Sequence, residues 1–349
     1  MKLVFCGTPQ FAVPTFEALR AAGHEIPLVV SQPDRPVGRA QQMTAPPVKQ
    51  TAVASGIAVV QPEKIRNNLE FRAQLEAIRP DAIVVVAYGR IIPGWMLTLP
   101  RLGCINLHGS LLPKYRGAAP IQWSLAMGDR VTGNTTMLLE EGLDTGPILL
   151  QQSVEIGPSE TASDLFVRLA EAGAPLMVET LAGLEDGSLQ PRAQNHEGAT
   201  YAPILDREDG RMDFAGRSAA ELYNRWRGFQ PWPGAFTTLE GKKLIVHRMA
   251  IARPDELAAV SDAGAGSADP GSIQDSGSIQ DSGSIQDPGS IQDPGSIHVD
   301  EHRFFVACAG NTWLEFVELQ LEGKKRMTAG ELLRGMQIPD LARLGPGAE

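Results

Sequence analysis

Four short, continuously apolar segments in the first third of the chain constrain its fold most strongly. They are residues 3–7, 26–32, 82–88 and 103–108, and each is bounded by glycine, proline or polar residues. Between the first two, residues 11–23 read as a helix that ends at a glycine. Apolar strands separated by helices are typical of a parallel sheet covered on both faces. The pattern predicts an open, Rossmann-like α/β domain, whose ligands bind beyond the carboxyl ends of the strands.

A long helix is expected at about 161–184, because Leu165, Leu169 and Leu176 share one face at helical spacing. Thr161 and Asp164 have the spacing of a capping box at its start. A helix in this position would complete the first domain, which we place at residues 1–184.

Beyond about residue 206 the pattern changes to strand-like runs, at 234–239, 242–249, 303–310 and 313–320. Short strands that follow one another without intervening helices are typical of a β-rich domain. We therefore expect a linker at 185–206 and a second, OB-like barrel domain at 207–349.

A strict six-residue repeat of the form PGSIQD interrupts the second domain at residues 270–299. Each unit has one apolar residue, so burial cannot offset the entropy of ordering the tract. A parallel β-helix would complete fewer than two turns here. We therefore expect a flexible loop insertion at about 253–295, and we predict that residues 270–293 can be deleted with little effect.

The net charge of −10 belongs almost entirely to this insertion. Residues 253–301 contain ten acidic side chains and one basic one, so they carry −9 and leave −1 for the other 300 residues. A near-neutral body can still carry a basic face. The charge therefore does not exclude a nucleic-acid partner.

Localisation follows from three simpler features. No apolar run approaches the roughly 20 residues that cross a bilayer, and the apolar amino terminus continues into a Gly-Thr-Pro turn without a small-residue cleavage site. The three cysteines, Cys6, Cys104 and Cys308, are too few for a disulfide framework, and we expect buried, unreactive thiols. These features favour a cytoplasmic protein without membrane contact.

The densest group of chemically useful residues lies at 103–122. Asn106 and His108 are two residues apart at the end of a predicted strand, so they face the same side. Asn offers an N–H donor for a developing oxyanion, and His offers proton transfer near neutral pH. Asp144 lies in a glycine-bounded turn farther along. Taken alone, each would more often be structural. Together they form a set without a nucleophile, which suits transfer between two bound substrates.

Other site types are disfavoured. The first strand ends in Gly7-Thr8-Pro9 rather than G-x-G-x-x-G, and Pro9 lacks the backbone donor that a pyrophosphate cradle uses. The sequence has no Walker A motif and no His-x-x-x-His pair. We expect no metal.

Several of these segments resemble the 10-formyltetrahydrofolate-dependent formyltransferase family, and in particular its members that act on methionyl-tRNA. The resemblance spans nearly the whole chain outside about 253–295. The first-domain motifs are FCGTPQFAVP, SQPDRPVGR, VVVAYGRIIP, INLHGSLLPKYRGAAPIQ and EEGLDTG. The second-domain motifs are YAPILDREDGRMDF, FQPWPGAF and LEGKKRMTAGELLRG.

The resemblance implies transfer of the formyl group of 10-formyltetrahydrofolate, as co-substrate, to the methionyl amine of initiator methionyl-tRNA, for translation initiation. It implies that Asn106 holds the formyl oxygen, that His108 manages the proton of the amine, and that Asp144 supports His108. The implied folate-binding residues are Ser110, Leu111, Leu112, Pro113, Val86, Ala87, Tyr88 and Gly89.

For tRNA, the resemblance implies a contact by Arg39. Here Ala40, Gln41 and Gln42 follow it where the family is usually basic, and Ile204 stands where the family's linker usually has a lysine. Further candidates for phosphate contact, which would equally suit exposed turns, are Lys242, Lys243, Lys324, Lys325 and Arg326. A monomer is expected.

Two alternatives stay open. The first is a folate-dependent formyltransferase acting on a small amine, such as a nucleotide amino sugar or glycinamide ribonucleotide. The second, of another class, is an inactive folate- or tRNA-binding module. The segment GKKRMTAGELLRG favours tRNA over a small amine, and the presence of Asn106, His108 and Asp144 together disfavours an inactive module.

Overall fold

The computed structural model describes residues 1–38, 41–253, 293–300, 302–338 and 342–345. The chain divides into two compact units, Met1–Leu205 and Asp206–Glu349. Most of the predicted loop insertion, and Arg39 and Ala40 in the first unit, lie outside the described residues.

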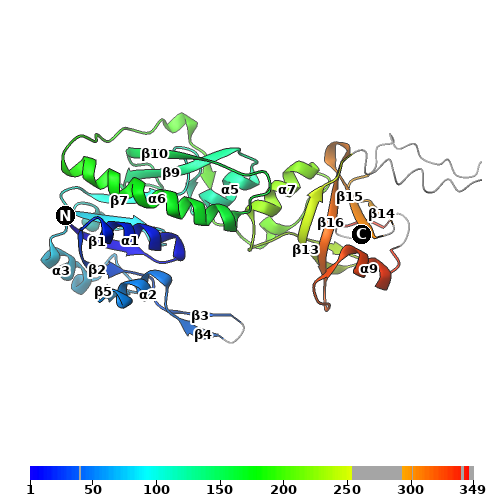
Figure 1. Cartoon of the computed structure of the whole chain (residues 1–349), viewed down its shortest axis with the longest axis horizontal. Helices are drawn as coiled ribbons and strands as arrows, with labels where there is room; N and C mark the ends of the chain where they lie inside the picture. The colour runs from blue at the N-terminus through cyan, green and yellow to red at the C-terminus, as the bar shows by residue number, and fades with distance from the viewer. Residues whose placement is uncertain (39–40, 254–292, 301, 339–341, 346–349) are drawn as a thin grey trace, which may run out of the picture. The chain divides into compact units, whose positions relative to one another are not determined.

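The first unit is built on a seven-stranded sheet with the order β10-β9-β7-β6-β1-β2-β5 (Figure 1). The five strands from β7 to β5 are parallel. The predicted open α/β sheet is therefore confirmed. The strands are β1 (Lys2–Gly7), β2 (Glu25–Val30), β5 (Ala58–Val60), β6 (Ala82–Val86), β7 (Cys104–His108), β9 (Val131–Leu138) and β10 (Ile148–Glu155).

Helices cover both faces of the parallel part of this sheet, which explains why β1 and β6 are apolar at nearly every position. On β1, Leu3 and Phe5 pack into one core, and Val4 and Cys6 pack into another. The first core includes residues of α1 (Val13–Ala21), α2 (Pro47–Ala54) and α6 (Ala162–Glu185). The second includes residues of α3 (Leu69–Ile78) and α4 (Gly94–Leu97). The expected long helix is α6, and its capping box between Thr161 and Asp164 is present.

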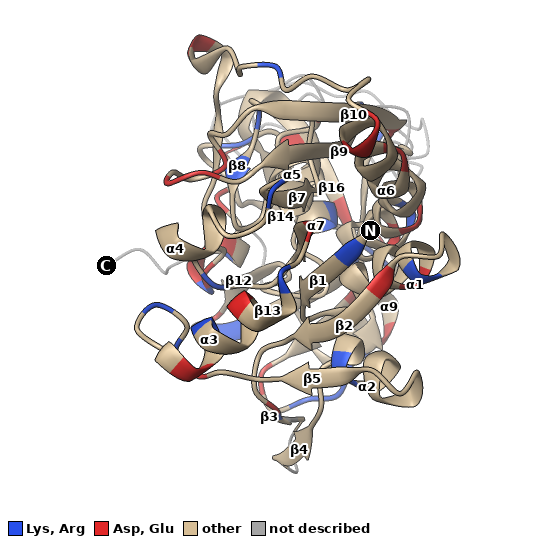
Figure 2. Cartoon of the chain, turned by 90° about the vertical axis from the view of Figure 1, so that its left-hand side faces the viewer, with Lys and Arg blue, Asp and Glu red and all other residues tan. Residues whose placement is uncertain are grey.

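Two antiparallel strands, β9 and β10, extend the parallel sheet beyond β7 (Figure 2). The sequence pattern did not indicate them. Three consecutive residues of β9, Asn134, Thr135 and Thr136, are polar yet fully buried. Their side chains bond to neighbouring backbone and hydroxyl groups, which makes burial tolerable but removes the apolar signal.

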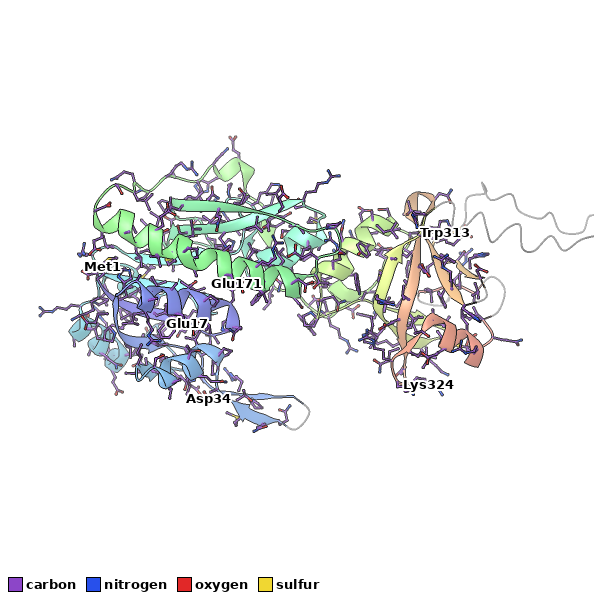
Figure 3. The ribbon with its side chains drawn as sticks, in the orientation of Figure 1. Met1, Glu17, Asp34, Glu171, Trp313 and Lys324 are labelled. Carbon is purple, nitrogen blue, oxygen red and sulfur yellow. The ribbon has the colours of Figure 1, made fainter. Side chains whose placement is uncertain are left out.

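A small hairpin of β3 (Arg35–Val37) and β4 (Gln42–Thr44) projects from the first unit (Figure 1). Asp34 lies at its base (Figure 3). The Asp34 carboxylate accepts hydrogen bonds from Lys49 Nζ at 2.8 Å and from Gln61 Nε2 at 2.7 Å. These bonds hold the pKa of Asp34 below its usual value. They connect the hairpin to α2 and to the segment after β5.

The second unit contains a six-stranded antiparallel sheet, with β12, β13, β16, β15 and β14 in spatial order and β17 paired with β16. The predicted β-rich fold is confirmed. Its hydrophobic core includes residues of α7 (Ala219–Gly228) and α9 (Ala329–Gly335). The strands are β12 (Phe236–Leu239), β13 (Lys242–Ile251), β14 (Ile297–Asp300), β15 (Arg303–Cys308), β16 (Thr312–Leu321) and β17 (Met327–Thr328).

The ends of the insertion are anchored in this sheet. β13 ends at Ile251, and the described residues resume at Asp293, four residues before β14 begins at Ile297. The Asp293 carboxylate pairs with Arg343, and its carbonyl oxygen accepts from Ser296 N at 3.0 Å. Asp293 therefore belongs to the turn before β14, and a deletion of the repeat should end at residue 292.

Deletion of residues 270–292 is expected to leave the melting temperature and kcat near the wild-type values. Lengthening a flexible loop costs only about 0.6 kcal/mol per doubling, so shortening it should change stability little. A matched variant that extends the deletion through Ser296 removes the Asp293 contacts and is expected to melt earlier. Equal, large losses of stability in both variants would show that the repeat is packed structure.

No helix in the described part of the chain is long and apolar enough to cross a membrane.

Candidate active site

The candidate site lies at the carboxyl edge of the parallel strands, where β7 ends. Ile105 and Leu107 of β7 pack into the core on the α6 side. Side chains alternate along a strand, so Asn106 and His108 lie on the opposite face, as predicted. Asn106 pairs in register with Val85 of the neighbouring strand β6. Asn106 and His108 therefore lie towards the carboxyl edge of the sheet, beside the apolar strand β6.

His108 is buried and has a defined set of neighbours. Its Nε2 atom lies 2.9 Å from the carbonyl oxygen of Tyr115. A carbonyl only accepts, so Nε2 is assigned the proton, and Nδ1 keeps a lone pair. Nδ1 lies 3.7 Å from Oδ2 of Asp144. A second proton on Nδ1 would face this carboxylate, which is the arrangement that a proton-accepting histidine needs.

Asp144 reaches His108 from a loop of unusual backbone conformation. Its φ angle of 52° lies in the left-handed region, which Asp tolerates better than most side chains. Its Oδ2 atom accepts a hydrogen bond of 2.9 Å from Gly117 N. The carboxylate thus lies between a backbone donor and the imidazole, and these contacts fix its orientation.

Asn106 differs from the buried amides of this unit. It is half-buried, and its side chain makes no hydrogen bond with any residue that the structure describes. By contrast, Asn134 is fully buried and donates to Leu169 O at 2.8 Å. The Asn106 amide is therefore free to donate to an oxygen of a bound substrate.

The loop that follows β7 is held by its own polar groups. Ser110 Oγ donates to Lys114 O at 2.6 Å, and Leu112 N donates to Thr135 Oγ1 at 3.1 Å. The Leu112–Pro113 peptide bond is cis. Ser110 and Leu112 are buried, so they shape the loop from inside. The assignment of Ser110 to Pro113 to the folate site stays a prediction.

The segment after β6 presents its backbone at the same edge. Ala87 and Gly89 are exposed, with φ angles of 45° and 79°. Between them, Tyr88 is buried, and its carbonyl oxygen accepts from Thr8 Oγ1 at 3.1 Å and from Gln32 Nε2 at 3.2 Å. The assignment of Val86 to Gly89 to the folate site also stays a prediction.

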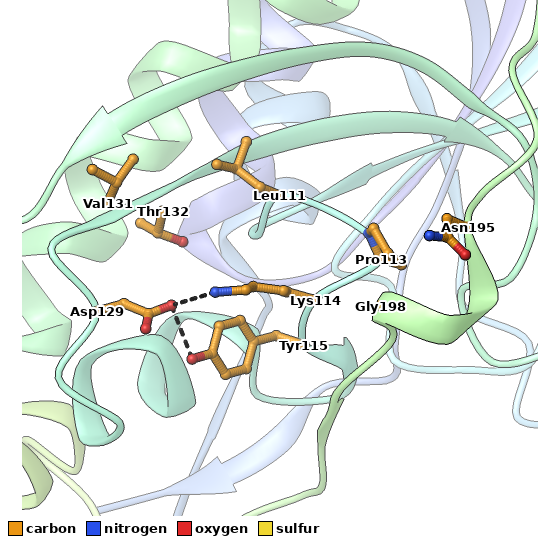
Figure 4. Close-up of a pocket in the computed structure, with 9 residues that line it drawn as sticks. All are labelled: Leu111, Pro113, Lys114, Tyr115, Asp129, Val131, Thr132, Asn195 and Gly198. Carbon is orange, nitrogen blue, oxygen red and sulfur yellow. Dashed lines mark hydrogen bonds and ion pairs between the residues drawn. The ribbon is translucent and has the colours of Figure 1, made fainter.

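A cavity of about 510 Å³ adjoins the site through Tyr115 (Figure 4). The Tyr115 hydroxyl donates to Asp129 at 3.0 Å, and Lys114 Nζ lies 3.8 Å from the same carboxylate. Asn106, His108 and Asp144 do not line this cavity. It is lined by Leu111, Pro113, Lys114, Tyr115, Asp129, Val131, Thr132, Asn195 and Gly198.

The sheet of the second unit brings its two groups of predicted tRNA contacts together. Lys242 and Lys243 begin β13, and the segment 324–326 follows the end of β16. Glu322 N donates to Lys243 O at 2.8 Å, so the two groups share one end of the sheet. Lys324 is labelled there in Figure 3.

The individual cations in this group are not equivalent. Lys243 Nζ lies 3.8 Å from the centre of the Phe236 ring. Partial burial, followed by the nearby Arg207, lowers the pKa of Lys243. Arg326 pairs with Glu318, whereas Lys242, Lys324 and Lys325 are exposed. Their tRNA contact stays a prediction, and Arg39 lies outside the described residues.

Sequence reasoning did not identify Arg116 and Gln194. Both are buried, and the Arg116 guanidinium donates to Gln194 Oε1 from Nη2 at 2.7 Å. Arg116 lies within the motif KYRGAAP, where a charged residue amid apolar neighbours was an available signal. Gln194 lies in a polar linker with no such signal.

The described residues contain no group of three or more His, Cys, Asp or Glu side chains arranged to hold a metal ion.

The fold and the polar side chains at the carboxyl edge of its sheet are those of an α/β protein with a site suited to group transfer. Residues 1–181 match the family model "Formyl transferase", and residues 204–337 match "Formyl transferase, C-terminal domain". The chain belongs to the formyl transferase family.

Within that family, the chain is similar along its whole length to proteins named methionyl-tRNA formyltransferase. The relative from Acidobacterium capsulatum is 61% identical over 99% of this chain and 100% of its own length. The one from Koribacter versatilis is 50% identical over 99% of each chain.

Among solved structures, the fold is similar to that of WlaRD, a sugar 3N-formyl transferase solved in the presence of dTDP and 5-N-formyl-THF. The TM-score is 0.59 at 15% identity, over 93% of this chain and 99% of that one.

Proposed function

We propose that this chain transfers the formyl group of 10-formyltetrahydrofolate to the methionyl amine of initiator methionyl-tRNA, for translation initiation. The observation that carries the proposal is the full-length similarity to methionyl-tRNA formyltransferases, at up to 61% identity. The polar set of Asn106, His108 and Asp144 at the sheet edge supports it. A chain of this kind acts in the cytoplasm, where charged tRNA is used.

The edge of the sheet has the groups that a formylated folate would need. The exposed backbone at Ala87 and Gly89 offers donors and acceptors beside the candidate catalytic residues. The unpaired amide of Asn106 offers a donor for the formyl oxygen. When bound, 10-formyltetrahydrofolate would supply the formyl group. We assign its binding to the segments 86–89 and 110–113.

The attacking group is the amine of the second substrate rather than a side chain of the enzyme. Cys104 begins the same strand, but it is buried and its Sγ donates to Met96 O at 3.3 Å. Burial raises the pKa of Cys104 to about 12, so the thiol is protonated at neutral pH. Neither Asn106 nor His108 needs to form a covalent bond in a direct transfer.

Asn106, His108 and Asp144 each have a separate role in this transfer. Asn106 donates a hydrogen bond to the formyl oxygen as negative charge develops there. His108 accepts the proton that the amine loses as it attacks the formyl carbon. The bond between that carbon and N10 of the folate then breaks, and the proton returns from His108 to N10, so that tetrahydrofolate leaves. Asp144, 3.7 Å from Nδ1, stabilises the positive charge that His108 acquires. The arrangement favours the transition state for transfer between two bound substrates over the bound substrates themselves.

The second unit and the hairpin would hold the tRNA. The cations of the segments 242–243 and 324–326 lie at one end of β13 and β16, and we propose that they contact tRNA phosphates. Arg39 falls between β3 and β4 in the sequence, and the hairpin of these strands is tied to the first unit through Asp34.

Replacing Arg39 with alanine is expected to lower kcat/KM for methionyl-tRNA roughly two- to tenfold and to leave KM for the folate unchanged. Loss of one phosphate contact should also make the dependence of kcat/KM on salt less steep. Arg101→Ala is the matched control, because Arg101 pairs with Asp81 near the amino ends of the strands. Equal kcat/KM values for Arg39→Ala and wild type would show that Arg39 is only a solvated surface residue.

The direct test of the function is an assay with 10-formyltetrahydrofolate and charged initiator tRNA, in which formylmethionyl-tRNA is measured after mild hydrolysis. The proposal expects formyl transfer to the methionyl amine and none to uncharged tRNA. Folate binding without any transfer to charged tRNA would favour the inactive binding module instead.

A further inference from the structure

We propose that Gln194 is a positioning residue, whose side-chain amide holds the loop 142–146 so that the Asp144 carboxylate stays beside His108. The inference rests on the proposed function, since it assigns a role in that reaction to a residue of the linker.

All four hydrogen-bonding positions of the Gln194 amide are used. Oε1 accepts from Arg116 Nε at 3.2 Å and from Arg116 Nη2 at 2.7 Å. Nε2 donates to Asp144 O at 2.9 Å and to Gly146 O at 2.7 Å. A glutamine amide has two donors and two principal acceptor sites, so the side chain is saturated. At 6% exposure it is also shielded from water, which would otherwise compete for these bonds.

These bonds close a ring around the Asp144 carboxylate. Gln194 binds the carbonyl of Asp144 on one side and the side chain of Arg116 on the other. The next residue after Arg116, Gly117, donates its backbone N–H to Asp144 Oδ2. Gln194 thus connects the two segments between which the carboxylate is held.

The loop has little packing of its own to replace this support. Glu141, Gly142 and Leu143 are exposed, and Leu143 is 57% exposed despite its apolar side chain. The left-handed φ of Asp144 is easier for Asp than for most side chains, but it remains less favourable than the right-handed region and is held by its surroundings. Hydrogen bonds from outside the loop must therefore supply much of that support.

The linker that carries Gln194 is itself anchored. Arg192 N and Ile148 O are 2.8 Å apart, as are Ile148 N and Arg192 O. Farther along, Arg116 N donates to Thr200 O at 2.8 Å, and β11 (Tyr201–Ala202) pairs with β8 (Arg116–Gly117). Gln194 therefore lies in a segment that is bonded to β10 of the large sheet on one side and to β8 on the other, which makes it a rigid support.

Gln194→Glu separates positioning from folding. The carboxylate would still accept from Arg116 and would form an ion pair with it, so the melting temperature should stay within a few degrees of wild type. It could no longer donate to the carbonyls of Asp144 and Gly146 and would repel them. We expect kcat to fall about 10- to 100-fold, because small misplacements of a supporting group have effects of this size. KM for folate and for methionyl-tRNA should change less than threefold.

The matched control is Gln190→Glu, the same substitution in the same linker. Gln190 is exposed, and among the described residues its side chain bonds to Gly187 O alone, so its variant should retain wild-type kcat. Hydrogen exchange of the substrate-free enzyme gives a second measurement. Amides of residues 142–146 should exchange faster in Gln194→Glu and at the wild-type rate in Gln190→Glu.

The outcomes are distinguishable. Wild-type kcat in a folded Gln194→Glu variant, or a kcat loss that occurs only with an equal loss of stability, would overturn the positioning role. Should that variant fail to fold, Gln194→Met/Arg116→Met replaces both partners by apolar groups, a change that stability often tolerates. The same kcat loss is expected in it, and wild-type kcat would again overturn the role. If the wild-type enzyme does not formylate charged tRNA, the proposed function fails, whereas the exchange measurement still decides whether Gln194 holds the loop.

Discussion

Replacing His108 with alanine is expected to lower kcat by about 100- to 10,000-fold, the range found for general acid–base groups. The reason is that the lost imidazole is the group that we propose accepts the proton of the attacking amine, with Asp144 3.7 Å from its Nδ1 atom. Folate affinity should be nearly unchanged. The measurement is single-turnover formylation at saturating methionyl-tRNA, with folate binding followed separately.

Two further variants sharpen this prediction. His24→Ala is the control, because His24 lies just before β2, at the opposite edge of the same sheet, and should retain wild-type kcat. Asp144→Ala should also lower kcat strongly, but adding it to His108→Ala should have little further effect, since we propose that Asp144 acts through His108. Fully additive losses would contradict this coupling, and wild-type kcat in folded His108→Ala would remove His108 from the mechanism.

Asn106→Ala is expected to lower kcat about 100- to 1,000-fold, as the removal of an oxyanion donor does elsewhere. The Asn106 amide has no partner among the described residues, so its loss should leave no unsatisfied group in the folded protein. The melting temperature should therefore stay close to the wild-type value. The two measurements are kcat with charged tRNA and thermal unfolding of the same preparation.

Asn134→Ala is the informative contrast to Asn106→Ala. It removes the donor to Leu169 O, which would be left buried without that bond, at a cost of about 1–3 kcal/mol in stability. We expect a lower melting temperature with kcat near wild type below the transition. If Asn106→Ala instead lost stability and kept its kcat, Asn106 would be a structural amide like Asn134.

The sequence predicts best those parts of the fold where burial is complete on both sides. The strands β1, β2 and β6 are apolar at nearly every position, and helix α6 repeats its apolar residues at helical spacing. In each of these elements apolar residues occupy the buried positions, so the sequence pattern predicts the element directly. The antiparallel strand β9 was not predicted, because Asn134, Thr135 and Thr136 are buried through hydrogen bonds rather than through apolar character.

In the candidate site, too, some residues could be predicted from local spacing and others could not. Asn106 and His108 could be predicted together because a strand places residues two apart on one face. The contact between His108 and Asp144 joins residues 36 positions apart, and no local spacing indicates it. Gln194 is farther still from Asp144, in a polar linker where an amide has no distinguishing signal. Such contacts depend on how the whole domain packs.

A competition between amines for one formyl donor tests most directly whether charged initiator tRNA is the acceptor of the formyl group. Wild-type enzyme would be given 10-formyltetrahydrofolate with charged initiator tRNA and an excess of a nucleotide amino sugar or glycinamide ribonucleotide, and both formylated products would be quantified. We expect formylmethionyl-tRNA to form with a kcat/KM at least about 1,000-fold above that for either small amine, since the contacts that we propose between the tRNA and the cations of the second unit are not open to a small amine. A kcat/KM for a small amine equal to or above that for methionyl-tRNA would contradict this expectation.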